Sequence, residues 1–148
     1  MMNFRLFYLV LFFFFSVNLP TSAQLLGKEE KGKASFYAKK FNGRKTSLGE
    51  IFNQKEFTAA HRTLPFNTMV EITNLTNNKS VIVRVNDRGP YHRSRLIDLS
   101  HAAAEYLGIV KTGVATVKLR VVGMEGMVLL GRNEVITELG DIVMSNKE

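Results

Sequence analysis

Four side chains of this sequence have types suited to acid–base chemistry on a sugar. They are Glu50, His61, Asp87 and Asp98. Cleavage of a glycosidic bond needs a carboxylic acid that protonates the leaving oxygen, and anionic or polar groups that stabilise an oxocarbenium-like transition state. These residue types are therefore the ones that glycosidic-bond cleavage needs.

Each of these residues also has an ordinary structural interpretation. Glu50 follows a turn-rich segment, where a glutamate is usually a solvated charge. A single histidine such as His61 is more often structural than catalytic. Asp87 precedes a Gly-Pro turn, where an aspartate bonds its own backbone, and Asp98 lies close to a predicted helix start, which favours an anion. These alternatives remain open on the sequence alone.

Several short motifs occur in one order along the chain, and together they carry a family resemblance. The motifs are Lys33–Tyr37, Gly49–Glu50, Thr58–His61 with Leu64–Pro65, Asn86–Pro90 and Ile97–Ser100. They resemble the RlpA-like double-psi β-barrel family, bacterial envelope proteins related in fold to expansins and to the barrel of MltA-type lytic transglycosylases. The resemblance runs from about Gly32 to Val122 and implies a mainly-β fold, a six-stranded double-psi β-barrel with one short helix near its mouth.

The resemblance also implies a substrate and a reaction. The substrate is the glycan strand of peptidoglycan, and the reaction is that of an endolytic lytic transglycosylase. One carboxyl group, which we expect to be Asp98 or Asp87, protonates the linkage oxygen, and the sugar's own primary hydroxyl then attacks the anomeric carbon and forms a 1,6-anhydro end. Glu50 would raise the pKa of that acid or stabilise the cation, and His61 would place the substrate. The substrate-binding residues that we expect are Tyr37, Thr58, Arg88 and Arg95. No cofactor is implied, and the three histidines show no spacing typical of a metal site.

Two departures from the family pattern keep other functions open. Many relatives carry an acidic residue where this chain has Asn53, and an asparagine supplies neither an acid nor a charge. Phe36 replaces a common tryptophan but keeps an aromatic face. A non-catalytic, expansin-like polysaccharide-binding module is therefore the alternative, followed by a hydrolase and by a structural or nucleic-acid-binding barrel.

The N-terminal sequence predicts that the protein is exported. A single positive charge, Arg5, precedes an apolar run over residues 6–15, and small residues end at Ala23. This pattern is typical of a signal peptide over residues 1–23, and the run is too short for a membrane-spanning helix of about 20 residues. The chain has no cysteine, which excludes a lipid anchor and disulfides. We expect a soluble, secreted or periplasmic protein without stable membrane insertion.

The net charge is +7, and it stays basic after the loss of Arg5. A basic protein is attracted to polyanions. After export the available polyanions are the cell wall and the membrane surface, so we expect a cell-wall partner and no nucleic acid. The alternative, that the charge serves only solubility and non-specific adhesion, stays open.

Alternating apolar residues predict short strands over 34–38, 69–75, 81–85 and 114–122. Residues 77–79 (Asn-Asn-Lys) tolerate left-handed turns and predict a hairpin between the second and third of these strands. Short strands at close intervals are typical of a small barrel.

The remaining segments complete one domain. Ser100 is a suitable N-cap and Gly108 a suitable end for a short helix. Residues 24–31 are predicted as a loose leader and residues 32–122 as the barrel. Residues 123–148 form an extension, in which 127–130 and 134–136 are expected to pair as a short hairpin. We expect no separate peptidoglycan-binding repeat domain after the barrel.

Overall fold

The computed structural model describes residues 22–125, 127–128, 134–136 and 142–144. Residues 1–21 of the predicted signal peptide lie outside the described residues, and its last two positions open helix α1 (Ser22–Leu25). None of the helices in this described part has both the length and the apolar character needed to cross a membrane.

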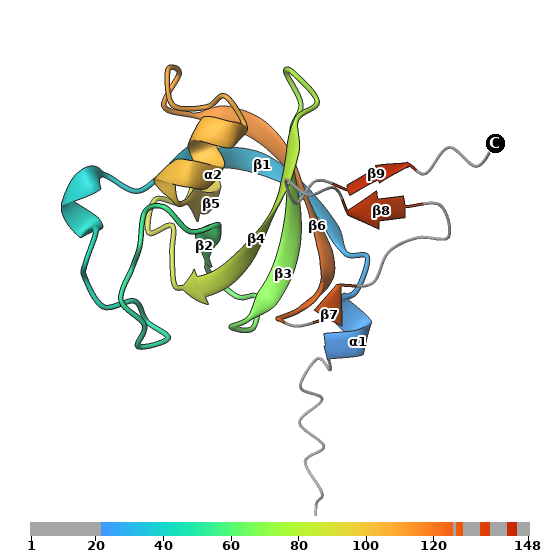
Figure 1. Ribbon diagram of the computed structural model, residues 1–148, viewed down its shortest axis with the longest axis horizontal. Helices are drawn as coiled ribbons and strands as arrows, with labels where there is room; N and C mark the ends of the chain where they lie inside the picture. Colours follow the sequence, from blue (N-terminus) through green and yellow to red (C-terminus); the bar gives the residue numbers. More distant parts are fainter. Residues whose placement is uncertain (1–21, 126, 129–133, 137–141, 145–148) are drawn as a thin grey trace, which may run out of the picture.

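The architecture is a closed barrel of short strands (Figure 1). The strands are β1 (Glu29–Phe36), β2 (Thr58–His61), β3 (Thr68–Asn74), β4 (Ser80–Asp87), β5 (Arg95–Leu99), β6 (Ala115–Met124), β7 (Met127–Val128), β8 (Glu134–Ile136) and β9 (Ile142–Met144). They form a sheet of order β1-β5-β2-β4-β3-β6-β7, which the β1–β6 pairing closes into a barrel. The six-stranded barrel and the short helix α2 (His101–Tyr106), which follows β5, confirm the predicted fold class. A single-turn 3-10 helix, η1 (Lys39–Phe41), lies between β1 and β2.

The predicted hairpin between β3 and β4 is confirmed. Val70 pairs with Val83 and Ile72 with Val81, and all four side chains are buried. Asn78 occupies the connecting turn with a positive φ of 57°, a conformation that asparagine tolerates better than most residues. The alternating apolar side chains thus point into the barrel core, and the residues of the turn set the register in which the two strands pair.

Helix α2 begins and ends where the sequence predicts. The Ser100 hydroxyl accepts a hydrogen bond from the Ala103 N–H, and Gly108 has a positive φ of 73° just after the helix. Ala103 and Leu107 are fully buried. The helix lies over one end of the barrel in Figure 1, next to β1 and β5, and directly follows the strand that carries Asp98.

The prediction of a loose leader over 24–31 is wrong for its last three residues. Strand β1 begins at Glu29, which pairs with Arg120, and Lys31 pairs with Lys118. Main-chain pairing with β6 orders this segment, in which Glu29 and Lys31 are exposed and Glu30 is partly buried. A polar side-chain pattern therefore hid a strand that backbone hydrogen bonds stabilise.

The C-terminal extension pairs differently from the expected hairpin. Among the described residues, β7 pairs with β6, so that Met127 faces Met124, and β8 pairs with β9. β7 therefore continues the barrel sheet, because the chain reverses directly after β6. Residues 129–133, which contain the expected turn, lie outside the described residues.

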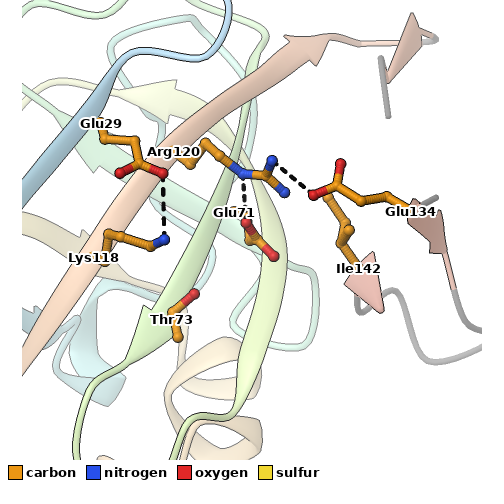
Figure 2. Close-up of a pocket in the computed structure, with 7 residues that line it drawn as sticks. All are labelled: Glu29, Glu71, Thr73, Lys118, Arg120, Glu134 and Ile142. Carbon is orange, nitrogen blue, oxygen red and sulfur yellow. Dashed lines mark hydrogen bonds and ion pairs between the residues drawn. The ribbon is translucent and has the colours of Figure 1, made fainter. Parts of the chain in front are cut away.

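One arginine connects the barrel to this extension, as Figure 2 shows. The Arg120 guanidinium lies 2.8 Å from a Glu71 carboxylate oxygen and 2.9 Å from one of Glu134 on β8. A hollow of about 270 Å³ surrounds these side chains, and a further ion pair joins Lys118 to Glu29 at its edge. Glu71 is buried, so its charge depends on Arg120 for compensation.

Removing that compensation should destabilise the barrel. We expect Arg120→Met to lower the free energy of unfolding by about 2–4 kcal/mol, because Glu71 stays buried without its cation. The double variant Arg120→Met/Glu71→Leu should recover most of this loss, as urea unfolding would measure. A double variant no more stable than the single one would contradict the account.

Candidate functional site

A cleft of about 630 Å³ opens where the ends of β1, β2, β4 and β5 meet. Both predicted aspartates, Asp87 and Asp98, line it. Three of the four predicted substrate-binding residues, Tyr37, Arg88 and Arg95, line it as well. The fold therefore brings together side chains that are far apart in the sequence.

Strand register places the two aspartates on either side of Ala60. Ala60 on β2 pairs with Asp87 at the end of β4 and with Asp98 on β5. Directly paired residues point to the same face of a sheet, and two strand spacings separate the outer Cα atoms by roughly 10 Å. A register shift between Ala59 and Ala60 makes the pairing with Asp87 possible. The small Ala60 side chain forms the floor between the two carboxylates.

Asp87 is held as a carboxylate by four donors. The Ser47 hydroxyl donates at 2.6 Å, the Tyr37 hydroxyl at 2.7 Å, and the backbone N–H groups of Ser47 and Arg88 at 2.8 Å. Burial raises the pKa of Asp87, but these hydrogen bonds outweigh burial, and the net pKa lies below its usual range. Asp87 is therefore ionised over most of the pH range.

Asp98 has the opposite environment. Burial raises its pKa above the usual range, although the charges of Arg95 and Arg62 act against the shift. An Arg95 guanidinium nitrogen lies 3.2 Å from one carboxylate oxygen and another donates to the second oxygen at 3.3 Å. Asp98 therefore retains a proton more readily than an ordinary aspartate.

Two carboxylates whose pKa values move apart in one cleft are suited to different tasks. The group with the raised pKa can donate a proton, and the group with the lowered pKa can stabilise positive charge. The geometry thus separates the two sequence candidates for the acid: Asp98 has the environment of a proton donor and Asp87 that of a fixed anion.

Glu50 is not among the residues that line the cleft. Its two carboxylate oxygens accept hydrogen bonds from Arg84 at 2.8 and 2.9 Å, and one also accepts a bond from Asn86 at 3.1 Å. The hydrogen bond from Arg84 is the largest influence on Glu50 and lowers its pKa. Glu50 therefore cannot raise the pKa of the acid by direct contact from this position.

His61 also lies outside the cleft lining, in the interior. Its Nδ1 accepts hydrogen bonds from the backbone N–H groups of Thr63 and Leu64, which stabilises the turn after β2. Burial lowers the pKa of His61 to about 4, so the ring is neutral at physiological pH. The structure gives His61 a turn-stabilising position rather than a substrate-placing one.

The predicted substrate-binding residues differ in whether their polar groups are already hydrogen-bonded within the protein. Arg88 donates to the carbonyls of His61 and Leu64, and its guanidinium lies 3.7 Å from the centre of the Phe66 ring. Tyr37 donates its hydroxyl to Asp87, and burial raises its pKa far enough to keep it protonated. Thr58 is buried and does not line the cleft.

Sequence reasoning missed several cleft residues, among them Ser47 and Tyr91. Ser47 belongs to the turn before Glu50, where the sequence signalled only a loop. Tyr91 directly follows the Asn86–Pro90 motif, and its position next to a candidate aspartate was the available signal.

Comparison with known proteins identifies relatives of this barrel. The model of a family described as lytic transglycolase matches residues 29–119. The endolytic peptidoglycan transglycosylase RlpA of Pasteurella multocida is 49% identical over 110 residues, which cover 74% of this chain and 37% of that protein. The protein of the same name from Vibrio cholerae is 52% identical over 99 residues, 67% of this chain and 38% of the relative. The chain thus spans less than half the length of these relatives.

Solved structures share the fold. A Streptomyces papain inhibitor superposes with a TM-score of 0.53 at 23% identity, over 64% of this chain and 94% of the inhibitor. An expansin of Clavibacter michiganensis also gives a TM-score of 0.53, at 18% identity, over 64% of this chain and 50% of the expansin. Together with the family match, these likenesses confirm the expected double-psi β-barrel.

The position of His61 predicts a pH dependence of stability. In the unfolded chain this histidine takes up a proton near pH 6.5, but in the folded barrel only near pH 4. Stability is therefore fully present above pH 6.5 and falls as the pH drops towards 4, by about 2–3 kcal/mol from this residue. His61→Asn keeps an acceptor for the turn N–H groups without titrating. We expect the difference in unfolding free energy between the wild type and this variant to shrink between pH 7 and pH 4.5 in urea titrations. A difference that stays constant would contradict the neutral, buried state of His61.

Proposed function

Because the chain belongs to the lytic transglycolase family of double-psi β-barrels, we propose that it is an endolytic transglycosylase that cleaves the glycan strands of peptidoglycan. The observation that carries the proposal is the pair Asp87 and Asp98, which share one cleft and have pKa values shifted in opposite directions. The names of the relatives support the substrate and reaction, and the match lies over the barrel that contains this pair.

In the proposed reaction Asp98 acts first as the acid. Its carboxyl proton passes to the glycosidic oxygen, and the bond from that oxygen to the anomeric carbon breaks. The primary hydroxyl of the same sugar then attacks the anomeric carbon, and its proton returns to the Asp98 carboxylate. The product is a 1,6-anhydro end, no water is consumed, and Asp98 regains its starting state.

Asp87 serves as the anion of the proposed reaction. Its four donors keep it ionised, so a negative charge is present where positive charge develops on the sugar ring. Tyr37 and Ser47 position this carboxylate and do not exchange protons with the substrate. No step of the proposal requires Glu50 or His61 to touch the glycan.

We also propose that the reaction takes place after export. The support is the N-terminal sequence, in which Arg5 precedes an apolar run and small residues end at Ala23. Peptidoglycan lies outside the cytoplasm, so an exported barrel would meet the proposed substrate there.

Amide variants of the two aspartates test the proposal. We expect Asp98→Asn and Asp87→Asn each to lower the release of anhydro-ended fragments from wall sacculi by a factor of about 10² or more, while glycan binding persists. Asp87→Asn should also lower the melting temperature, because the carboxylate accepts four hydrogen bonds. Asp98→Asn should not lower it, because the substitution removes a carboxylate whose ionisation burial disfavours.

Glu105→Gln on the exposed face of α2 is the matched control, and its activity should equal that of the wild type. Mass spectrometry of the soluble fragments distinguishes the products. Reducing ends in place of anhydro ends would assign hydrolysis, and binding without any cleavage by the wild type would assign the polysaccharide-binding alternative.

The two pKa shifts also predict an acidic pH optimum. The reactive form has Asp98 protonated and Asp87 ionised, so the rate should fall as the pH rises through the raised pKa of Asp98 and as it drops through the lowered pKa of Asp87. Arg95→Gln removes a charge that lowers the Asp98 pKa, and should move the alkaline limb of the kcat/KM profile to higher pH. An alkaline limb unmoved by this substitution would assign that limb to another group.

A further inference from the structure

Tyr91 is the most exposed large apolar or aromatic side chain in the described part of the protein. Its exposed fraction is 90%, against 63% for Ile51 and 60% for Met127, and the exposed phenylalanines Phe41 and Phe57 are below 40%. Despite this exposure Tyr91 lines the cleft that contains Asp87 and Asp98. An aromatic ring that stands in water at the edge of a cleft has most of its apolar area still available for a ligand.

The backbone before Tyr91 holds the ring at this edge. Tyr91 lies four residues after Asp87 in the connection between β4 and β5. Gly89 has a φ of 135°, which favours glycine, and a Cβ atom built there would lie 4.0 Å from Tyr91 Cε2 and 3.7 Å from the Ala60 Cβ. The ring therefore lies next to the backbone that leads away from Asp87 and from the floor of the cleft.

The other aromatic rings that line the cleft are already partly covered. Phe36 lies edge-on to His101, and Phe41 contacts Tyr37 and has the Arg44 guanidinium over its ring. Asp87, Asp98 and Arg95 provide charges and hydrogen-bond partners, and the Tyr37 hydroxyl is engaged by Asp87. Tyr37 is also packed against Phe52, with ring centroids 4.6 Å apart, so that part of its ring is already covered. Tyr91 has no such partner among the described residues.

A sugar ring combines an apolar C–H face with polar edges. A tyrosine matches it, because its ring offers a flat apolar area, its hydroxyl reaches a polar edge, and few rotatable bonds are fixed on binding. A glycan strand extends beyond the linkage that is cut, so sugars next to that linkage lie along the cleft rim. Binding sites typically combine such aromatic surfaces with a few polar groups.

We propose that Tyr91 forms a stacking subsite for a sugar of the glycan strand next to the linkage that is cut. The proposal rests on the function proposed above. Tyr91 holds the strand so that the linkage lies over Asp98, and it takes no part in proton transfer. Its contribution is to binding, and it is present in the ground state and the transition state alike.

Substitutions at Tyr91 separate ring stacking from other roles. We would measure binding of purified, peptide-free glycan strands in an Asp98→Asn background, where cleavage is blocked. Tyr91→Ala should weaken binding at least tenfold, whereas Tyr91→Phe should stay within about twofold of the parent because the ring is retained. Met127→Ala, which removes an exposed apolar side chain outside the cleft, is the matched control and should bind like the parent.

A tryptophan at position 91 would report contact with the glycan strand through its fluorescence. The sequence contains no tryptophan, so Tyr91→Trp carries a single indole reporter. Its fluorescence should change in a saturable manner with added glycan strands, with the same dissociation constant as the binding assay. In the otherwise wild-type protein, Tyr91→Ala should raise KM for soluble glycan strands and change kcat little.

The possible outcomes test the Tyr91 stacking subsite separately from the proposed transglycosylase activity. Equal binding by the Ala, Phe and Trp variants would overturn the subsite, even if the wild type releases anhydro ends. A lower kcat at unchanged KM in Tyr91→Ala would also overturn it. Conversely, weak binding by Tyr91→Ala together with no cleavage by the wild type would support the subsite while refuting the transglycosylase. The melting temperature of each variant should match its parent, because the side chain is almost fully exposed.

Discussion

The position of Ala60 in strand β2 is the constraint on which the cleft depends. This short, fully buried strand runs parallel to β4 and antiparallel to β5, and the register shift before Ala60 sets it opposite both Asp87 and Asp98. Without that shift, β4 would present its other face at this level, because a change of one residue reverses the direction of side chains. A larger residue than alanine would also fill the space between the two carboxylates. The barrel thus fixes the distance between the aspartates by backbone pairing rather than by contacts between their side chains.

Within this backbone arrangement, hydrogen bonding decides which of the two carboxylates has the lower pKa. Both aspartates are partly buried, and burial alone would raise the pKa of each. Only Asp87 receives donors from a neighbouring loop, two of them from Ser47, together with the Tyr37 hydroxyl. Asp98 has instead the charge of Arg95, whose nearest contacts are 3.2 and 3.3 Å long. Two identical side chains in one cleft therefore have pKa values shifted in opposite directions, which suits acid catalysis with one anionic neighbour.

Local patterns in the sequence predicted the β3–β4 hairpin and the limits of α2, because turn residues such as Asn78 and caps such as Ser100 act within a few positions. They failed for Glu29 to Lys31, because these residues pair with residues 118–120 of β6, which are distant in the sequence. The family resemblance led to Asp87 and Asp98, but it could not place Glu50 or His61. The partner of Glu50, Arg84, lies 34 residues away in the sequence, so tertiary structure sets this contact. The N–H partners of His61 are local, but the burial that lowers the pKa of its ring comes from the fold.

The position of Glu50 nevertheless connects it to the cleft. Its bonds to Arg84 and Asn86 attach the loop that carries Ser47 to the end of β4, and the backbone N–H of Leu48 reinforces this attachment by donating to the Asn86 carbonyl. Ser47 in turn supplies two of the donors that lower the pKa of Asp87. An ion pair with one exposed partner is worth little by itself, since 39% of the Glu50 side chain is exposed. Its consequence here is geometric, because it fixes the loop whose Ser47 donates hydrogen bonds to the Asp87 carboxylate. Glu50 can therefore influence the cleft without lining it.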